Sequence, residues 1–78
     1  MPSLKCTYAE FLAILRQHGV DLHRHDGGSH QRWRMADEQG NVFFVDFAPH
    51  GSMQADIPIG TLNSMIRQSG LPKKLFIK

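Results

Sequence analysis

The sequence predicts an α+β fold in which two helices cover one face of a three-stranded antiparallel sheet. Apolar residues recur at helical spacing within residues 7–18 and 60–70 of the 78-residue chain. Between them lie three runs with alternating side chains, at residues 20–25, 29–36 and 41–47. The connections between the runs are short and contain glycine, so neighbouring strands pair as hairpins. Two helices with apolar stripes can then cover one face and leave the other to solvent.

The first helix is predicted to begin at Thr7. Thr7 and Glu10 have the spacing of a capping box, in which each side chain bonds the backbone of the other. Gly19 is a suitable stop after the last helical turn. The apolar stripe between these ends consists of Tyr8, Phe11, Leu12 and Leu15.

The second strand carries the residues with the clearest chemical potential. It follows a predicted hairpin turn at residues 26–28, whose glycines permit a positive φ. Because side chains alternate along a strand, His30, Arg32 and Arg34 share one face. Trp33 lies on the opposite face and is predicted to enter the core. The first face therefore offers an imidazole beside two guanidinium groups.

The third strand and the second helix complete the predicted core. The turn at residues 37–41 precedes a strand whose core face carries Phe43, Val45 and Phe47. Residues 49–56 are predicted as a loop, after which Pro58 leads into the second helix and Gly70 ends it. Residues 73–78 are expected to form a short fourth strand or an ordered arm. The apolar stripe of the second helix consists of Leu62, Met65 and Ile66.

Length, charge and cysteine content limit the kinds of protein that this chain can be. We expect residues 1–78 to form a single domain, because a chain this short has one modest core. The formal charge of +2 is compatible with a polyanionic partner. Cys6 is the only cysteine, so no internal disulfide can form, which fits a reducing cytoplasm. The sequence shows no apolar run of membrane-spanning length and no signal peptide, so we expect a cytoplasmic protein with no membrane partner.

Two motifs stand at matching places in the predicted fold. The first is Gly28-Ser29-His30, directly after the hairpin turn. The second is Gly60-Thr61-Leu62, continued by Met65-Ile66 and Ser69-Gly70-Leu71 along the second helix. The order of elements has the topology of a double-stranded-RNA-binding domain. Together with the first helix, the motifs cover most of residues 8–71, and the chain resembles the HicA family of toxin–antitoxin ribonucleases.

This resemblance implies a toxin that cleaves mRNA and blocks translation. It implies neutralisation by a HicB-type antitoxin, with the toxin monomeric alone and hetero-oligomeric in the complex. It also implies that His30 is the catalytic group. Because RNA carries its own nucleophile, the 2′-hydroxyl, the reaction needs proton transfer and charge stabilisation but no metal or other cofactor. The predicted RNA contacts are Gly28, Ser29, Arg32, Arg34, His50, Lys73 and Lys74.

Three other interpretations remain open at this point. The same fold suits a non-catalytic module that recognises A-form RNA by its shape. A protein-interaction domain could use Val42 and Phe44, which are predicted on the solvent face of the third strand. His23 and His25 have a spacing that can bind zinc, although a site needs three or four ligands. The further ligands would have to come from Asp21, Asp26 or His30.

Overall fold

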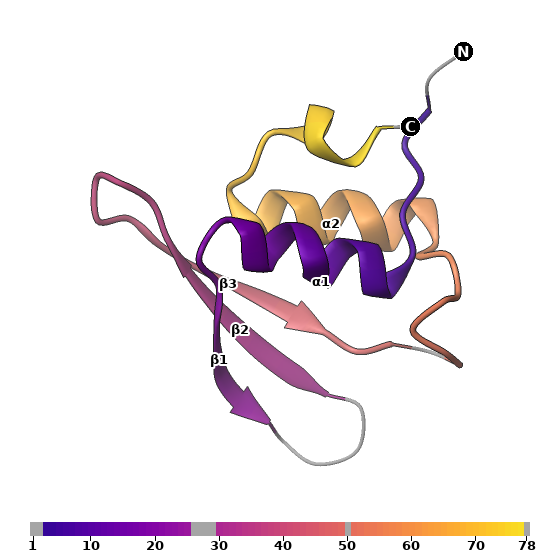
Figure 1. Cartoon of the computed structure of the whole chain (residues 1–78), viewed down its shortest axis with the longest axis horizontal. Helices are drawn as coiled ribbons and strands as arrows, with labels where there is room; N and C mark the ends of the chain where they lie inside the picture. Colours follow the sequence, from indigo (N-terminus) through magenta and orange to yellow (C-terminus); the bar gives the residue numbers. More distant parts are fainter. Residues whose placement is uncertain (1–2, 26–29, 50, 78) are drawn as a thin grey trace.

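The computed structural model describes residues 3–25, 30–49 and 51–77 (Figure 1). The elements are α1 (Tyr8–Gln17), β1 (Asp21–His25), β2 (Gln31–Ala36), β3 (Val42–Phe47), α2 (Ile59–Ser69) and the short 3₁₀ helix η1 (Lys73–Phe76). Both α-helices lie over the same side of the sheet (Figure 1). This arrangement confirms the predicted α+β fold, with its order of helix, three strands and helix.

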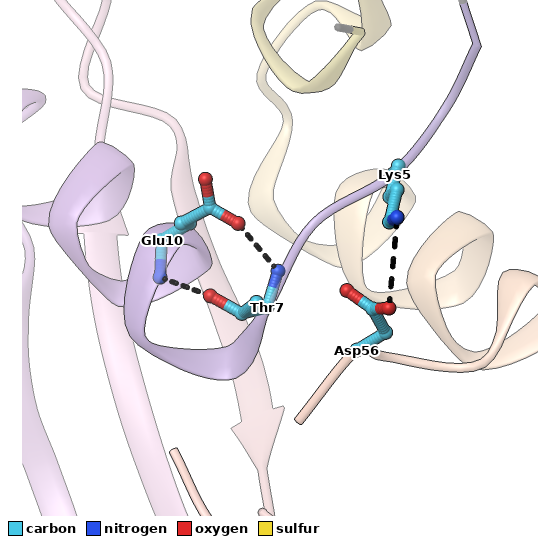
Figure 2. Close-up of polar contacts among 4 residues, drawn as sticks. All are labelled: Lys5, Thr7, Glu10 and Asp56. Atoms are coloured by element: carbon cyan, nitrogen blue, oxygen red, sulfur yellow. Dashed lines mark hydrogen bonds and ion pairs between the residues drawn. The ribbon is translucent and has the colours of Figure 1, made fainter. Parts of the chain in front are cut away.

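Helix α1 begins at the predicted capping box. The Thr7 Oγ1 accepts a hydrogen bond from the Glu10 backbone N–H at 3.1 Å, and the Thr7 N–H donates to Glu10 Oε1 at 2.9 Å (Figure 2). These two bonds satisfy two backbone donors that no helical carbonyl can reach. Nearby, the ammonium of Lys5 lies 3.9 Å from the carboxylate of Asp56 and ties the N-terminal segment to the loop before α2 (Figure 2).

The sheet has the order β1-β2-β3 with antiparallel pairing throughout. Strand β2 shows the predicted alternation, since Trp33 and Met35 are buried while Arg32 is exposed. The sequence predicted a strand over residues 29–36 with His30 inside it. The strand instead starts at Gln31, so His30 lies just before it. A β-bulge interrupts the pairing of β1 between Leu22 and Arg24. The predicted turn at residues 26–28 lies outside the described residues.

The core lies between the helices and the inner face of the sheet. Phe11 of α1 stacks on Phe47 of β3, with ring centroids 6.4 Å apart. Tyr8 meets the same Phe47 ring edge-on at 5.8 Å. The indole of Trp33 is 9% exposed, which confirms its predicted place in the core, and its Nε1–H donates to Gln31 Oε1 at 3.0 Å. Gln31 therefore helps to orient a core side chain.

The C-terminal tail forms an ordered arm. The prediction left a fourth strand open, but the segment folds as the 3₁₀ helix η1, followed by a single β-bridge between Leu4 and Ile77. The anchor is Phe76, which is 1% exposed and stacks on Phe11 with ring centroids 5.1 Å apart. Burial of this aromatic ring outweighs any strand pairing that the short tail could offer. None of the described helices has the length and apolarity needed to cross a membrane.

Candidate functional site

The side of the sheet that faces away from the helices carries Arg32 and Arg34, two of the predicted functional residues. We call it the open face. Its strand register places Arg32 beside Asp46, and Arg34 beside Phe44. The inner face is occupied by core residues such as Val45. The described side chains of the open face are Asp21, His23, Arg32, Arg34, Ala36, Val42, Phe44 and Asp46.

His30 is exposed and stands directly before β2. It lies at the end of the sheet where β1 and β2 are connected, because His25 pairs with Gln31 in the register. Three of the predicted RNA contacts, Gly28, Ser29 and His50, lie outside the described residues. An exposed imidazole at a strand terminus is accessible to a large polyanion.

Arg32 is at the centre of a small cluster on the open face. Its guanidinium carbon lies 4.8 Å from the centroid of the Phe44 ring, within the range of a cation–π interaction. The Phe44 ring also meets His23 edge-on, with centroids 4.9 Å apart and an interplanar angle of 62°. On its other side, Nη1 of Arg32 lies 4.0 Å from Oδ1 of Asp46. The fold thus joins an arginine, an aromatic ring, an imidazole and a carboxylate.

Arg32 and Arg34 each have a carboxylate opposite them on a neighbouring strand. Arg32 pairs in register with Asp46 of β3, and Arg34 pairs with Asp21 of β1. The side chains of Arg32 and Asp46 are 44% and 70% exposed, so water and salt screen their attraction. Exposed ion pairs contribute about 0–1 kcal/mol, so a ligand phosphate can displace this carboxylate at little cost.

The sequence interpretation missed Phe44, His23 and Asp46 as members of a cluster with Arg32. The register supplies a signal for two of them. Counting outward from the β2–β3 turn places Phe44 and Asp46 beside Arg34 and Arg32, as the structure shows. The bulge in β1 carries no comparable signal in this sequence, and it determines how His23 reaches the Phe44 ring.

Lys73 and Lys74 lie on a different part of the molecule. Both are exposed on η1, which lies beyond the helices from the sheet (Figure 1). Lys73 and Arg67 line a shallow groove of about 460 Å³ between α2 and the start of η1. The structure therefore separates the predicted RNA contacts into the open face, with Arg32 and Arg34, and a second basic surface near η1.

A hollow of about 270 Å³ lies at the other end of β2 from His30. Its wall includes Phe43, Gly70 and the acidic side chains of Asp37 and Glu38. The carboxylate of Asp37 accepts hydrogen bonds from the Asn41 backbone and side chain, at 2.8 and 2.9 Å. These bonds hold the pKa of Asp37 below its usual value of 3.8. This carboxylate stabilises the β2–β3 turn.

The described residues include no group of three or more His, Cys, Asp and Glu side chains placed to hold a metal ion. His23 lies in the part of the chain that the structure describes, and its ring contacts the ring of Phe44. The described residues therefore do not supply the three or four ligands that a zinc site at His23 and His25 would need.

The comparisons with known proteins give one match. The family model for the HicA toxin of bacterial toxin–antitoxin systems matches residues 8–71. The matched range runs from α1 to the residue after the Gly70 cap of α2 and includes His30 and the whole open face. Among curated proteins and among solved structures, nothing matches the chain. Because the family model covers most of its length, the chain belongs to the HicA toxin family of bacterial toxin–antitoxin systems.

Proposed function

We propose that this toxin is a metal-independent endoribonuclease that cleaves mRNA in the cytoplasm and thereby blocks translation. Membership of the family makes it the toxin of a toxin–antitoxin pair. The observation that carries the proposed nuclease activity is the position of His30. It is exposed, lies within the matched range and stands two residues before Arg32 on β2.

In this proposal His30 moves the protons of an internal transesterification. The 2′-oxygen of the RNA attacks the neighbouring phosphorus and loses its proton, the bond from phosphorus to the 5′-oxygen breaks, and the leaving oxygen gains a proton. A positioned imidazole can accept the first proton or donate the second, and such a group contributes roughly 10²–10⁴-fold to a rate. Arg32 and Arg34 share the open face and would stabilise the negative charge that develops on the phosphorane.

The remaining predicted contacts enter the proposal as binding residues. Gly28, Ser29 and His50 would bind the RNA. Lys73 and Lys74 would bind another part of the strand from the one at the open face, because η1 lies beyond the helices (Figure 1). A HicB-type antitoxin would block the reaction by covering His30. The free toxin would be a monomer, and the hetero-oligomer with antitoxin would be the inactive form.

The test compares wild type, His30→Ala and a control, His18→Ala. His18 is an exposed histidine at the C-cap of α1, so its removal controls for the loss of an imidazole elsewhere on the surface. The purified proteins are incubated with an mRNA transcript in EDTA, and growth is followed after tightly controlled induction. We expect cleavage and growth arrest with wild type and His18→Ala, and a loss of roughly 10²–10⁴-fold in rate with His30→Ala.

Two outcomes would reject the proposal. Equal cleavage by wild type and His30→Ala would place the chemistry elsewhere. If all three proteins bind duplex RNA with the same affinity and cleave no transcript, the domain is the RNA-binding module that the fold also suits.

A further inference from the structure

We infer that Phe44 is a positioning residue, which holds the guanidinium of Arg32 ready for a phosphate group of single-stranded RNA. We infer also that Asp46 occupies the place of that phosphate in the free protein. The inference rests on the proposed function, because it assumes that RNA is the ligand of Arg32. It assigns roles to two residues of β3 that act through Arg32 rather than on the reacting atoms.

Phe44 lies on the open face, between Arg32 and His23. An aromatic ring on the solvent side of a sheet gains little from burial, yet this ring is half-buried and contacts two polar neighbours. The guanidinium of Arg32 lies over it at 4.8 Å, and the His23 ring meets it edge-on at 4.9 Å. Phe44 is therefore the common support of one cation and one imidazole on the open face.

The Phe44 ring limits the flexibility of the Arg32 side chain. A free arginine side chain samples many rotamers, and it must give up this freedom to bind a phosphate in two-pronged geometry. Contact with the Phe44 ring restricts the guanidinium of Arg32 before the ligand arrives. Such preorganisation increases affinity by lowering the entropy lost on binding. Removing the ring would leave the charge of Arg32 unchanged but would let its guanidinium group sample more rotamers.

Arg32 also pairs with Asp46. Its carboxylate oxygen lies 4.0 Å from Nη1 of Arg32, and carboxylate and phosphate oxygens use the same donors of a guanidinium group. Because both side chains are largely exposed, the pair is weak and can exchange for a phosphate. Asp46 also repels the RNA backbone. Because of this repulsion, Asp46 should weaken RNA binding. Its ion pair should at the same time hold the Arg32 guanidinium in place in the free protein.

The test measures binding in the His30→Ala background, so that the probe stays intact. The probe is a fluorescein-labelled single-stranded RNA oligonucleotide, and its anisotropy is followed over a range of salt concentrations. Phe44→Leu should weaken binding about two- to five-fold, the size of an exposed cation–π contact, while Phe44→Trp should retain wild-type affinity. Asp46→Asn should tighten binding and steepen the dependence of log affinity on log salt by about 0.7.

The matched control is Val42→Ala. Val42 is 43% exposed on the same face of the same strand, so it tests loss of apolar surface without loss of the Arg32 contact. A double variant tests whether Phe44 acts through Arg32. Arg32→Ala combined with Phe44→Leu should bind no more weakly than Arg32→Ala alone, because the two substitutions remove one interaction. Thermal melting of every variant confirms that it is folded, and Phe44→Trp and Asp46→Asn keep the test valid if Phe44→Leu unfolds.

Several results would overturn the inference. It is wrong if Phe44→Leu binds RNA as Val42→Ala does, if the double variant shows additive losses, or if Asp46→Asn does not tighten binding. It is also wrong if Phe44→Leu weakens only the complex with a HicB-type antitoxin, since the open face would then serve a protein. Failure of the proposed nuclease has a different signature, namely wild type that does not cut RNA while the Phe44 and Asp46 variants still change its affinity as expected.

Discussion

The ring of Phe43 packs against the Cα of Gly70, where the C-terminus of α2 meets β3. Gly70 ends the helix in the left-handed conformation, with a φ of 72°. A β-carbon at this position would lie 2.8 Å from Cζ of Phe43, closer than such atoms approach in proteins. A second link joins the same two elements, because Gln68 Oε1 accepts a hydrogen bond from the Asp46 N–H at 3.0 Å. The end of α2 thus holds the strand that carries Phe44 and Asp46.

We predict that Gly70→Ala destabilises the protein more than Gly40→Ala does. Both glycines have a positive φ, which costs about 1–2 kcal/mol for a residue with a β-carbon. Only at Gly70 does the new methyl group also overlap the Phe43 ring, and overpacking of a core adds about 1–3 kcal/mol. Urea unfolding of wild type and both variants gives the two free energies of unfolding.

Gly40→Ala is the matched control because a β-carbon there meets no atom within 4 Å. Equal losses of stability in the two variants would show that the Phe43 ring moves aside freely, and would contradict the close contact at the end of α2.

A second prediction concerns the capping box of α1 (Figure 2). Thr7→Ala should lower the free energy of unfolding by about 0.5–2 kcal/mol, because the backbone N–H of Glu10 loses its acceptor. Glu10→Ala removes the reciprocal bond to the Thr7 N–H. A double-mutant cycle of the two substitutions in urea unfolding measures their coupling. Strict additivity would show that the two bonds act independently rather than as one motif.

Much of the fold could be predicted because its signals are local. The Thr7 and Glu10 spacing, the alternation along residues 31–36 and the glycine at the end of α2 each depend on a few neighbouring residues. The conformation of the tail could not be predicted in this way. It is determined by the stacking of Phe76 on Phe11, a contact between opposite ends of the chain.

The candidate site was only partly predictable for the same reason. Alternation placed Arg32 and Arg34 on one face, which the register confirms. The partners of Arg32 come from β3 and depend on the exact pairing across the turn, and the approach of His23 depends on a bulge. The predicted strand also extended past its true start at Gln31, because alternation continues in the sequence beyond the last paired residue.

A third prediction concerns the acid sensitivity of the β2–β3 turn. The Asn41 side chain and then its backbone N–H lower the pKa of Asp37 below 3.8 by hydrogen bonding its carboxylate. A lowered pKa in the folded state means that Asp37 contributes stability above 3.8, and that this contribution is lost as the pH falls through the lowered value. Asp37→Asn should therefore weaken the dependence of stability on pH in that acidic range.

An NMR titration of the Asp37 carboxyl carbon measures the pKa directly. Asn41→Ala removes the side-chain donor but keeps the backbone N–H, so it should shift the pKa of Asp37 part of the way back toward 3.8. An unchanged titration in Asn41→Ala would show that the side-chain bond is not the main cause of the lowered pKa.

The last prediction distinguishes the two basic surfaces by the effects of their substitutions on KM and kcat. Lys73 and Lys74 lie on η1, beyond the helices from the sheet, whereas Arg32 lies on the open face (Figure 1). If the lysines bind the RNA strand away from the reacting phosphate, the double substitution Lys73→Ala, Lys74→Ala should raise KM and leave kcat unchanged, because it removes binding that is equal in the ground state and the transition state. Arg32→Ala should lower kcat if its charge stabilises the phosphorane, as proposed. Steady-state cleavage of a labelled RNA measures both constants.

The salt dependence of RNA binding should also become less steep for the lysine variant, since each lost phosphate contact on a single strand reduces the slope by about 0.7. A fall in kcat for the lysine variant would place η1 at the reacting phosphate. An unchanged KM would instead leave this surface to the antitoxin.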